Sequence, residues 1–233
     1  MTTPYENQIL GAFLFALGIE CGRSGKFLTT NLFQQTPLDT TFGDLVIGAE
    51  WCLALEFKRE EGTIDSEKSK WSEAALQAFE RDSLLMIASR KAHLLCFSRP
   101  ASGGIGLISI AYATALGLDD SKVEISCDQL IKGIVKLVGE TPPARNNKVG
   151  LPPDELETYL RKLAAYRKQG GGSREATWVA VAKSGNGFKF KCASSLEQLV
   201  EPRQAPVRSL VERESRSAWR DPSPTRHVDE HER

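Results

Sequence analysis

The feature that most constrains this chain is a pair of short apolar runs, residues 42–47 and 51–58, which are separated only by residues 48–50. A turn this short between two runs of strand-forming residues predicts a β-hairpin. The two runs would then pair antiparallel, so that the start of the first run returns to the end of the second.

Side-chain alternation divides the second run into two faces. One face is apolar throughout and is expected to pack in the core; it consists of Trp51, Leu53, Leu55 and Phe57. The opposite face begins with Cys52 and Ala54 and ends in Glu56 and Lys58. We therefore expect a half-buried strand whose second face carries a carboxylate and an ammonium group side by side.

Asp44 opens the first strand, and hairpin pairing returns its carboxylate toward Glu56 and Lys58. Carboxylate oxygens are the ligands that hard divalent cations prefer. The hairpin therefore predicts a site for one or two such cations. A simpler interpretation of the same residues is a surface salt bridge between Lys58 and either acid, which would add little to stability.

A further carboxylate can come from the helix that is predicted over residues 6–19. This helix is apolar nearly all round, so it is expected to be largely buried, and Glu6 and Glu20 share one stripe with Leu10 and Phe13. A buried carboxylate is costly unless something pairs with it. Either Glu6 or Glu20 is therefore a candidate metal ligand; the alternative is that both lie at the helix ends and contact water.

An acid-x-lysine triplet alone has low specificity, because about one chance match is expected in a chain of this length. The chain contains a second copy at Asp120–Ser121–Lys122, which follows Gly117 and Leu118 in a predicted loop. No alternating strand precedes that copy. The Glu56 copy ends a strand and has Asp44 at the head of the partner strand, so it is the better candidate.

The arrangement of Gly43–Asp44, eleven further residues and then Glu56–Phe57–Lys58 resembles the signature of the PD-(D/E)XK nuclease superfamily. This superfamily includes restriction endonucleases, recombination exonucleases and Holliday-junction resolvases. The resemblance covers about residues 5–115, including the helix before the hairpin and the helix and strand after it; Gly43 stands where proline is common. No strand directly follows Lys58, so either residues 62–64 form a very short strand or the core contains a helical insertion.

The resemblance implies a metal-dependent phosphodiesterase. Asp44 and Glu56 would bind Mg²⁺ or Mn²⁺, and the Phe57 carbonyl could complete the shell. Lys58 would orient or deprotonate the attacking water, or stabilise the phosphate; these three roles remain open. The cation would lower the pKa of its bound water and screen the phosphate, which allows phosphodiester hydrolysis.

The expected fold is mixed α/β (α+β), with a restriction-endonuclease-like central mixed β-sheet flanked by helices as a catalytic core over residues 1–140. A small appendage over residues 151–200 combines a helix at 154–168 with a β-hairpin. Prolines and mixed charges predict a disordered tail over residues 201–233. The other predicted elements are a helix over 66–81, which residues 82–91 extend or follow as a second helix, and a helix that starts at 126 and ends near 139. Strands are predicted over 93–98, in the apolar run that follows residues 103–106 and ends at 112, and within 26–41.

The C-terminal hairpin, predicted at 177–183 and 188–192, carries lysines that alternate with aromatic residues. Lys183, Lys189 and Lys191, together with Trp178, could contact a phosphate backbone and stack on bases. The alternative is an ordinary amphipathic hairpin with a solvated lysine face.

Charge and cysteine content narrow the class of protein. The 30 Lys and Arg residues balance 30 Asp and Glu residues, so no global positive field draws the chain to nucleic acid. The five cysteines form no CxxC pair and predict free thiols in a reducing compartment. His93, His227 and His231 provide no zinc-ligand spacing.

No basic leader segment and no apolar run of membrane-spanning length is present in the sequence. We therefore expect a cytoplasmic protein without membrane contact. The predicted activity is that of a Mg²⁺-dependent nuclease acting on DNA. The alternatives are a non-catalytic subunit that retains a nuclease-like fold within a larger complex or homo-oligomer, and a nuclease for RNA or phage nucleic acid in a defence system.

Overall fold

The computed structural model of the chain describes most residues before position 168 and the backbone of two later strands. The described residues are 4–33, 43–48, 50–121, 123–138 and 149–167, together with the backbone of 178–184 and 187–193. All of them belong to the first of two compact units, Met1–Glu201. The second unit, Pro202–Arg233, lies outside the described residues, so the predicted tail stays a prediction.

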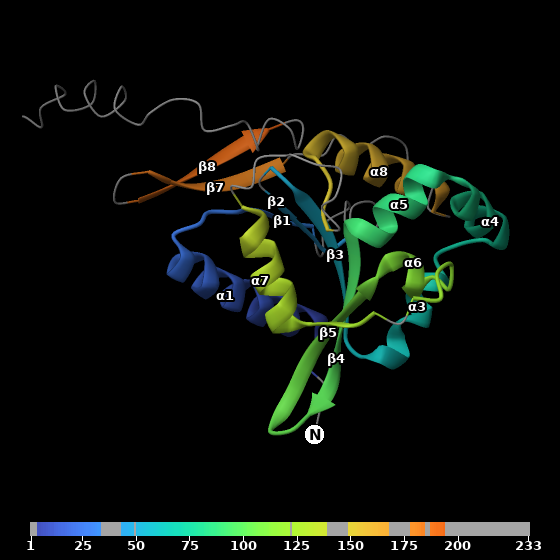
Figure 1. Cartoon of the computed structure of the whole chain (residues 1–233), viewed down its shortest axis with the longest axis horizontal. Helices are drawn as coiled ribbons and strands as arrows, with labels where there is room; N and C mark the ends of the chain where they lie inside the picture. Colours follow the sequence, from blue (N-terminus) through green and yellow to red (C-terminus); the bar gives the residue numbers. More distant parts are fainter. Residues whose placement is uncertain are drawn as a thin grey trace, which may run out of the picture. The chain divides into compact units, whose positions relative to one another are not determined.

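Figure 1 shows how the helices and strands are arranged. The N-terminal elements are α1 (Glu6–Ser24), β1 (Thr29–Leu32), β2 (Leu45–Gly48), β3 (Cys52–Lys58), the 3₁₀ turn η1 (Glu61–Thr63), α3 (Asp65–Lys68), α4 (Glu73–Arg81) and α5 (Ser83–Lys91). They are followed by β4 (His93–Ala101), β5 (Gly104–Ala111), α6 (Tyr112–Ala115), β6 (Ile125–Ser126), α7 (Cys127–Leu137), α8 (Pro153–Tyr166), β7 (Trp178–Ser184) and β8 (Gly187–Ala193).

Six strands form one sheet in the order β1-β2-β3-β4-β5-β6. Neighbouring strands are antiparallel except β3 and β4, which run parallel. The predicted mixed α/β class with a central mixed sheet flanked by helices is therefore confirmed. The predicted hairpin is β2–β3, in which Gly48 pairs with Cys52. A side chain at Gly48 would collide with Sγ of Cys52, so this tight turn requires glycine.

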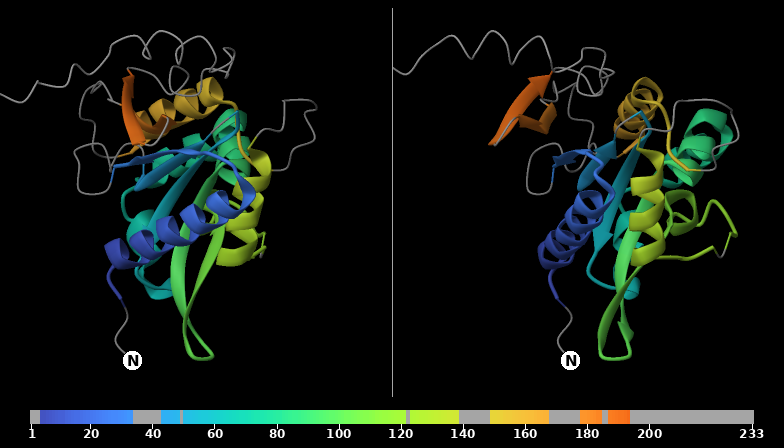
Figure 2. Two further views of the ribbon diagram at one scale, coloured as in Figure 1. Left: turned by 90° about the vertical axis from the view of Figure 1, so that its left-hand side faces the viewer. Right: turned by 60° about the vertical axis from the view of Figure 1, so that its left-hand side comes forward.

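Helices cover both faces of the sheet. In Figures 1 and 2, α1 and α7 lie against one face, whereas α3, α5, α6 and α8 lie against the other. On the first face the Phe13 ring of α1 packs against Phe57 of β3, with 5.5 Å between the ring centroids. On the second face His93 of β4 stacks on Tyr112 at 3.9 Å and contacts Tyr159 of α8 edge-on at 5.7 Å.

Burial of β3 differs from the prediction. The alternating pattern predicted a half-buried strand, but all seven residues of β3 are buried. Trp51 precedes the strand, and the face that begins with Cys52 and Ala54 is covered by α8. Glu56 and Lys58 therefore lie inside the protein, with only 3% and 7% of their surfaces exposed.

The segment after Lys58 resolves the choice between a short strand and a helical insertion. Residues 61–63 form a 3₁₀ turn, and α3, α4 and α5 follow before the chain returns as β4. Such a helical crossover is the usual way to join parallel neighbouring strands. The strand that pairs with β3 on this side is thus β4, where Leu95 is opposite Glu56 and Phe97 is opposite Lys58.

Local sequence signals set the helix ends. Ser126 Oγ accepts a hydrogen bond from the Gln129 amide at 3.3 Å, and Gln129 Oε1 accepts one from the Ser126 amide at 3.0 Å. Ser126 and Gln129 have the spacing of a capping box in the sequence, and these two bonds form that box at the start of α7. Helix α1 continues to Ser24, beyond its predicted end, because Gly25 ends it in the left-handed conformation at a φ of 60°.

Helix α1 packs through one stripe only. The expectation that it is largely buried is wrong, because Phe15 is 73% exposed and Ile19 is 41% exposed. Its buried residues are Ile9, Leu10, Phe13 and Leu17. One face of α1 meets the sheet, and the opposite face is exposed although it is apolar in sequence.

The C-terminal helix shares the core of the sheet. Helix α8, which we expected in the appendage, places Leu156, Tyr159, Leu160 and Leu163 in the same buried cluster as β3 and β4. Residues 139–148, which precede it, lie outside the described residues. Strands β7 and β8 pair as the predicted hairpin. In the described part of the chain, no helix combines the length and the apolar character needed to cross a bilayer.

The contact between Phe13 and Phe57 provides a test of the packing. Replacing Phe13 with Ala should lower the free energy of unfolding by about 3–5 kcal/mol, because it leaves a cavity between α1 and the sheet. Phe15→Ala on the same helix should change it by no more than about 0.5 kcal/mol, because Phe15 is exposed. Urea denaturation of both variants measures this difference, and equal effects would contradict the placement of α1.

Candidate functional site

Asp44 lies at the point where β2 begins, beside the end of β3. Its Oδ2 atom accepts a hydrogen bond of 2.6 Å from the backbone amide of Phe57, and its own carbonyl accepts one of 2.8 Å from the amide of Phe33. Gly43 precedes it with a φ of 78°, a conformation that favours glycine. Asp44 is thus fixed on both sides, and the hairpin returns its carboxylate to the end of β3 as predicted.

The Phe57 carbonyl shares the Asp44 side of β3. Within a strand, the amide and the carbonyl of one residue point to the same neighbour. Since the Phe57 amide binds Asp44, the Phe57 carbonyl is directed to the same edge, beyond the first residue of β2. A carboxylate and a carbonyl oxygen are thereby brought to one place.

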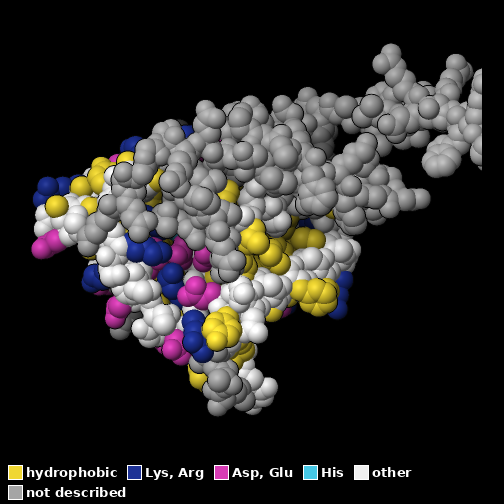
Figure 3. Space-filling view, turned by 180° about the vertical axis from the view of Figure 1, so that it is seen from behind, with side chains coloured by type: hydrophobic (Ala, Val, Ile, Leu, Met, Phe, Trp, Pro, Cys, Tyr) yellow, Lys and Arg dark blue, Asp and Glu magenta, His cyan; other side chains and the backbone are white. Residues whose placement is uncertain are grey.

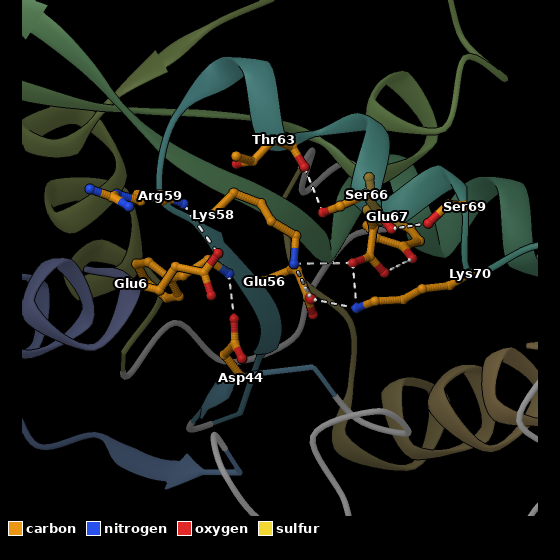
Figure 4. A network of polar contacts seen from close by, with 12 residues as sticks. Glu6, Asp44, Glu56, Lys58, Arg59, Thr63, Ser66, Glu67, Ser69 and Lys70 are labelled. Atoms are coloured by element: carbon orange, nitrogen blue, oxygen red, sulfur yellow. Dashed lines mark hydrogen bonds and ion pairs between the residues drawn. The ribbon is translucent and has the colours of Figure 1, made fainter. Parts of the chain in front are cut away.

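Glu56 and Lys58 point to the face of the sheet that α3 and α8 cover. The Lys58 ammonium lies 3.0 Å from Glu56 Oε1. Figure 4 shows that Lys58 extends from β3 toward Glu56 and Glu67, while Asp44 and Glu6 lie on the other side of the strand end. Glu56 and Lys58 are therefore in direct contact, Asp44 lies near enough for their charges to act on it, and all three residues are buried.

Two further residues close a ring of alternating charges. The Glu67 carboxylate of α3 lies 3.3 Å from the Lys58 ammonium and 2.6 Å from that of Lys70. Lys70 also contacts Glu56 Oε1 at 3.2 Å. Only Lys70 reaches the surface, with 35% of its side chain exposed. Lys70 is therefore the charge through which this buried ring meets solvent.

Arg167, directly after α8, anchors the ring from a distant part of the sequence. Its Nη2 atom donates to Glu67 Oε1 at 2.9 Å and to the Tyr112 hydroxyl oxygen at 2.8 Å. The Tyr112 hydroxyl in turn donates to Glu67 Oε1 at 2.7 Å. Glu67 is thus held by an arginine and a tyrosine on one oxygen and by two lysines on the other.

Burial and neighbouring charges shift the pKa values of these groups. Burial and the nearby Glu56 carboxylate raise the pKa of Asp44 to about 7. Burial alone would lower the pKa of Lys58, but Glu56 and Glu67 raise it overall, so its ammonium stays protonated. Burial alone would raise the pKa of Glu67, but Arg167, Lys70 and Lys58 hold it well below its usual range.

The two candidate carboxylates of α1 have different positions. Glu6 Oε1 accepts a hydrogen bond of 3.2 Å from the Arg59 amide, directly after β3, and its charge acts on both Asp44 and Lys58. Glu20 lies about 20 Å further along the helix, at 1.5 Å per residue. It faces Arg23 at 3.9 Å instead. The candidate ligand Glu20 is therefore wrong, whereas Glu6 borders the site.

The oxygen atoms at the end of β3 could provide some, but not all, of the ligands of a hard cation. Within the described part of the chain, no group of three or more His, Cys, Asp or Glu side chains is arranged to hold a metal ion. The oxygens of Asp44, Glu56 and the Phe57 carbonyl are nevertheless the donor type that Mg²⁺ and Mn²⁺ prefer, and Mg²⁺ usually keeps several water ligands. These residues fit a cation that is partly hydrated.

Sequence patterns did not reveal four residues of this network. Glu67, Lys70, Tyr112 and Arg167 carry no motif. Glu67 and Lys70 are three positions apart at a helix, which is typical of an exposed ion pair. Their burial follows from the way α3 and α8 meet over β3, which no local pattern reports.

The remaining predicted sites lie away from this network. Asp120 of the second triplet is exposed in a loop, and Lys122 lies outside the described residues. In the β7–β8 hairpin the register places Lys189 opposite Ala182 and Lys183 opposite Phe188. The side chains of Lys183, Lys189, Lys191 and Trp178 lie outside the described part, so nucleic-acid contact through them stays a prediction. The four cysteines whose side chains are described, Cys21, Cys52, Cys96 and Cys127, are free thiols.

Comparison of the chain with protein-family models, with curated proteins and with solved structures finds no match. Any function assigned to the chain therefore depends on the geometry and chemistry of its own residues.

The raised pKa of Asp44 predicts how stability changes with pH. A carboxyl whose pKa rises from 3.8 to about 7 on folding stabilises the folded state fully below pH 3.8, and this contribution is lost as the pH rises toward 7. In metal-free buffer, the free energy of unfolding should fall between pH 5 and pH 8 by about 2 kcal/mol more in the wild type than in Asp44→Asn. Denaturation series at both pH values measure this; equal slopes would contradict the shift.

Removal of Arg167 tests the anchoring of the ring. Arg167→Met should lower the free energy of unfolding by about 3–5 kcal/mol, because it removes a cation from the buried Glu67 carboxylate. Arg161→Met is a matched control on the same segment, since its ion pair with Glu157 is half-exposed and worth no more than about 0.5 kcal/mol. Chemical denaturation distinguishes the two variants. A small effect of Arg167→Met would show that Glu67 does not depend on it.

Proposed function

We propose that the chain is a metal-dependent nuclease of the PD-(D/E)XK type that hydrolyses phosphodiester bonds in DNA. The observation that carries this proposal is that Asp44, bonded to the Phe57 amide, lies near enough to Glu56 for the Glu56 charge to raise its pKa, while a protonated Lys58 pairs with Glu56. Such a combination of oxygen donors and a fixed ammonium group matches the needs of a phosphate substrate and a divalent cation.

Asp44, Glu56 and the Phe57 carbonyl are the residues that would hold Mg²⁺ or Mn²⁺, with Glu6 as a neighbouring acceptor. When bound, the cation lowers the pKa of a coordinated water and screens the phosphate charge. The protein contributes the rigid placement of these oxygens, because the Asp44 carboxylate accepts from the Phe57 amide and the Asp44 backbone carbonyl accepts from the Phe33 amide.

Lys58 acts as a hydrogen-bond donor rather than as a base in this proposal. Its raised pKa keeps the ammonium charged, so it has no lone pair with which to accept a proton from water. A fixed ammonium group stabilises negative charge that develops on the phosphate oxygens. Of the three roles that the sequence leaves open, phosphate stabilisation and orientation of the water suit the structure better than deprotonation.

The order of elements supports the family resemblance. A helix precedes the Asp44 hairpin, and helices followed by a strand come after it, which are the elements on which the resemblance rests. The strand after the helices, β4, lies directly beside β3 and parallel to it. A restriction-endonuclease-like core is thus compatible with the sheet, and the stretch after Lys58 is a helical insertion.

A non-catalytic subunit is the second candidate function. Its support is the ring of Glu56, Lys58, Glu67 and Lys70, which pairs every charge without a ligand. On the face shown in Figure 3, acidic and basic side chains are intermixed, as the neutral net charge predicts. DNA contact would then depend on a local patch, such as the lysines of the β7–β8 hairpin, or on a partner. Action on RNA or on phage nucleic acid would use the same chemistry.

A nuclease assay with matched variants tests the proposal. Purified protein should cleave DNA in the presence of Mg²⁺ or Mn²⁺, and Glu56→Gln or Lys58→Met should reduce the rate at least ~100-fold, because each removes a preorganised charge. Asp120→Asn alters the other acid-x-lysine triplet, in an exposed loop, and should leave the rate unchanged. Circular dichroism should confirm that each variant is folded.

Two results would contradict the nuclease assignment. One is a wild-type protein that cleaves neither DNA nor RNA with either cation and shows no saturable Mn²⁺ binding, which is the behaviour expected of a pure scaffold. The other is cleavage that persists in folded Glu56→Gln protein, which would place the active site elsewhere.

A further inference from the structure

Two buried polar atoms face the same point beside Gly43, and neither has a hydrogen-bond partner. They are Oε2 of Glu56 and Nε2 of His93. Glu56 is 3% exposed and His93 is fully buried. A buried polar atom that is left unsatisfied costs about 1–3 kcal/mol, so two such atoms at one place indicate that something binds between them.

Gly43 leaves room for that species. A Cβ atom at this position would lie 3.2 Å from Glu56 Oε2 and 3.9 Å from His93 Nε2, so both atoms border the space that glycine leaves empty. The φ of Gly43 is 78°, which independently disfavours any side chain. The space is next to Asp44 and therefore adjoins the proposed cation site.

The His93 ring is held in one orientation. It stacks on the Tyr112 ring at 3.9 Å with an interplanar angle of 11°, and its Nδ1 atom lies 2.7 Å from the Tyr159 hydroxyl. His93 is the first residue of β4 and is opposite Ala54 of β3. Ala54 and Glu56 are two residues apart and point to the same face of the sheet, so His93 shares that face with Glu56. The contact through Nδ1 leaves Nε2 directed at Gly43.

The contact of His93 through Nδ1 suits a ligand at Nε2. In the tautomer in which Nδ1 donates its proton to the Tyr159 hydroxyl, Nε2 carries a lone pair. Histidines that bind metals usually have a hydrogen bond of this kind on the other ring nitrogen.

The two oxygens of Glu56 have different surroundings. Oε1 is paired with the ammonium groups of Lys58 and Lys70, at 3.0 and 3.2 Å. Oε2 has no partner and is on the Gly43 side. The lysines therefore fix the carboxylate through one oxygen and leave the other available to a cation.

We propose that His93 Nε2 and Glu56 Oε2 are ligands of one divalent transition-metal ion beside Gly43. The inference rests on the proposed function, in which Glu56 is a metal ligand. It adds one nitrogen ligand to the oxygen ligands that the sequence predicts. Imidazole suits transition metals such as Zn²⁺, and affinity rises from Mn²⁺ to Co²⁺ along the first-row series, whereas Mg²⁺ is bound through oxygen. The chain therefore selects a transition metal over Mg²⁺. The carboxylate oxygen and the ring nitrogen with its lone pair are both electron-pair donors, which is the chemistry that a cation requires.

Metal titration with matched variants tests the ligand set. Calorimetric titration of the metal-free protein should give Co²⁺ and Mn²⁺ binding that is tighter than Mg²⁺ binding. His93→Phe keeps an aromatic ring on Tyr112 and removes the nitrogen, so it should weaken Co²⁺ binding at least ~10-fold and leave Mg²⁺ binding within about twofold. Tyr159→Phe removes only the hydroxyl that orients the ring and should weaken Co²⁺ binding to a smaller extent.

A spectroscopic measurement on the wild type requires no variant. Pulsed electron paramagnetic resonance of the Mn²⁺ complex should show hyperfine coupling to one imidazole ¹⁴N, because Nε2 of His93 would bind the ion directly. Absence of nitrogen coupling, or Co²⁺ affinity that is unchanged in folded His93→Phe, would overturn the inference.

The result is separable from the nuclease proposal. Cleavage of DNA with Mg²⁺ alone, together with no nitrogen coupling, would retain the nuclease and reject His93 as a ligand. Nitrogen coupling in a protein that cleaves no nucleic acid would retain the metal site and reject the nuclease.

Discussion

The burial of Glu56 and Lys58 is the constraint on which the rest of the structure depends. A carboxylate and an ammonium group inside a sheet that is covered on both faces are stable only with good geometry and further partners. Glu67 and Lys70 supply those partners, and they complete a ring in which each charge faces two of opposite sign. The helical segment that joins the parallel strands β3 and β4 supplies both of these partners.

The same constraint links distant parts of the sequence. Arg167 contacts Glu67 although 100 residues separate them, so the end of α8 must dock over β3 before the ring is complete. The cost of burying these charges is offset only when the N-terminal hairpin, the helical insertion and α8 are all in place. Loss of Glu67 should lower the pKa of Lys58, since Glu67 is one of the two carboxylates that keep its ammonium group protonated.

Local signals made much of the fold predictable from the sequence. Apolar runs around a short turn predicted the β2–β3 hairpin, and the capping box at Ser126 predicted the start of α7. The charge network was not predictable, because Glu67 and Arg167 resemble surface charges until tertiary packing buries them. The full burial of β3 was missed for a related reason: the alternating pattern cannot report a helix from elsewhere in the chain that covers the second face.

Anomalous X-ray diffraction from crystals soaked in Mn²⁺ tests the central claim most directly, because it locates a cation without reference to activity. The account predicts a peak within about 2–2.5 Å of carboxylate oxygens of both Asp44 and Glu56. The lysine ring should remain intact on the other side of Glu56. The absence of a peak there at saturating Mn²⁺, with Glu56 still paired only with Lys58 and Lys70, would contradict it and show that the buried charges serve the fold alone.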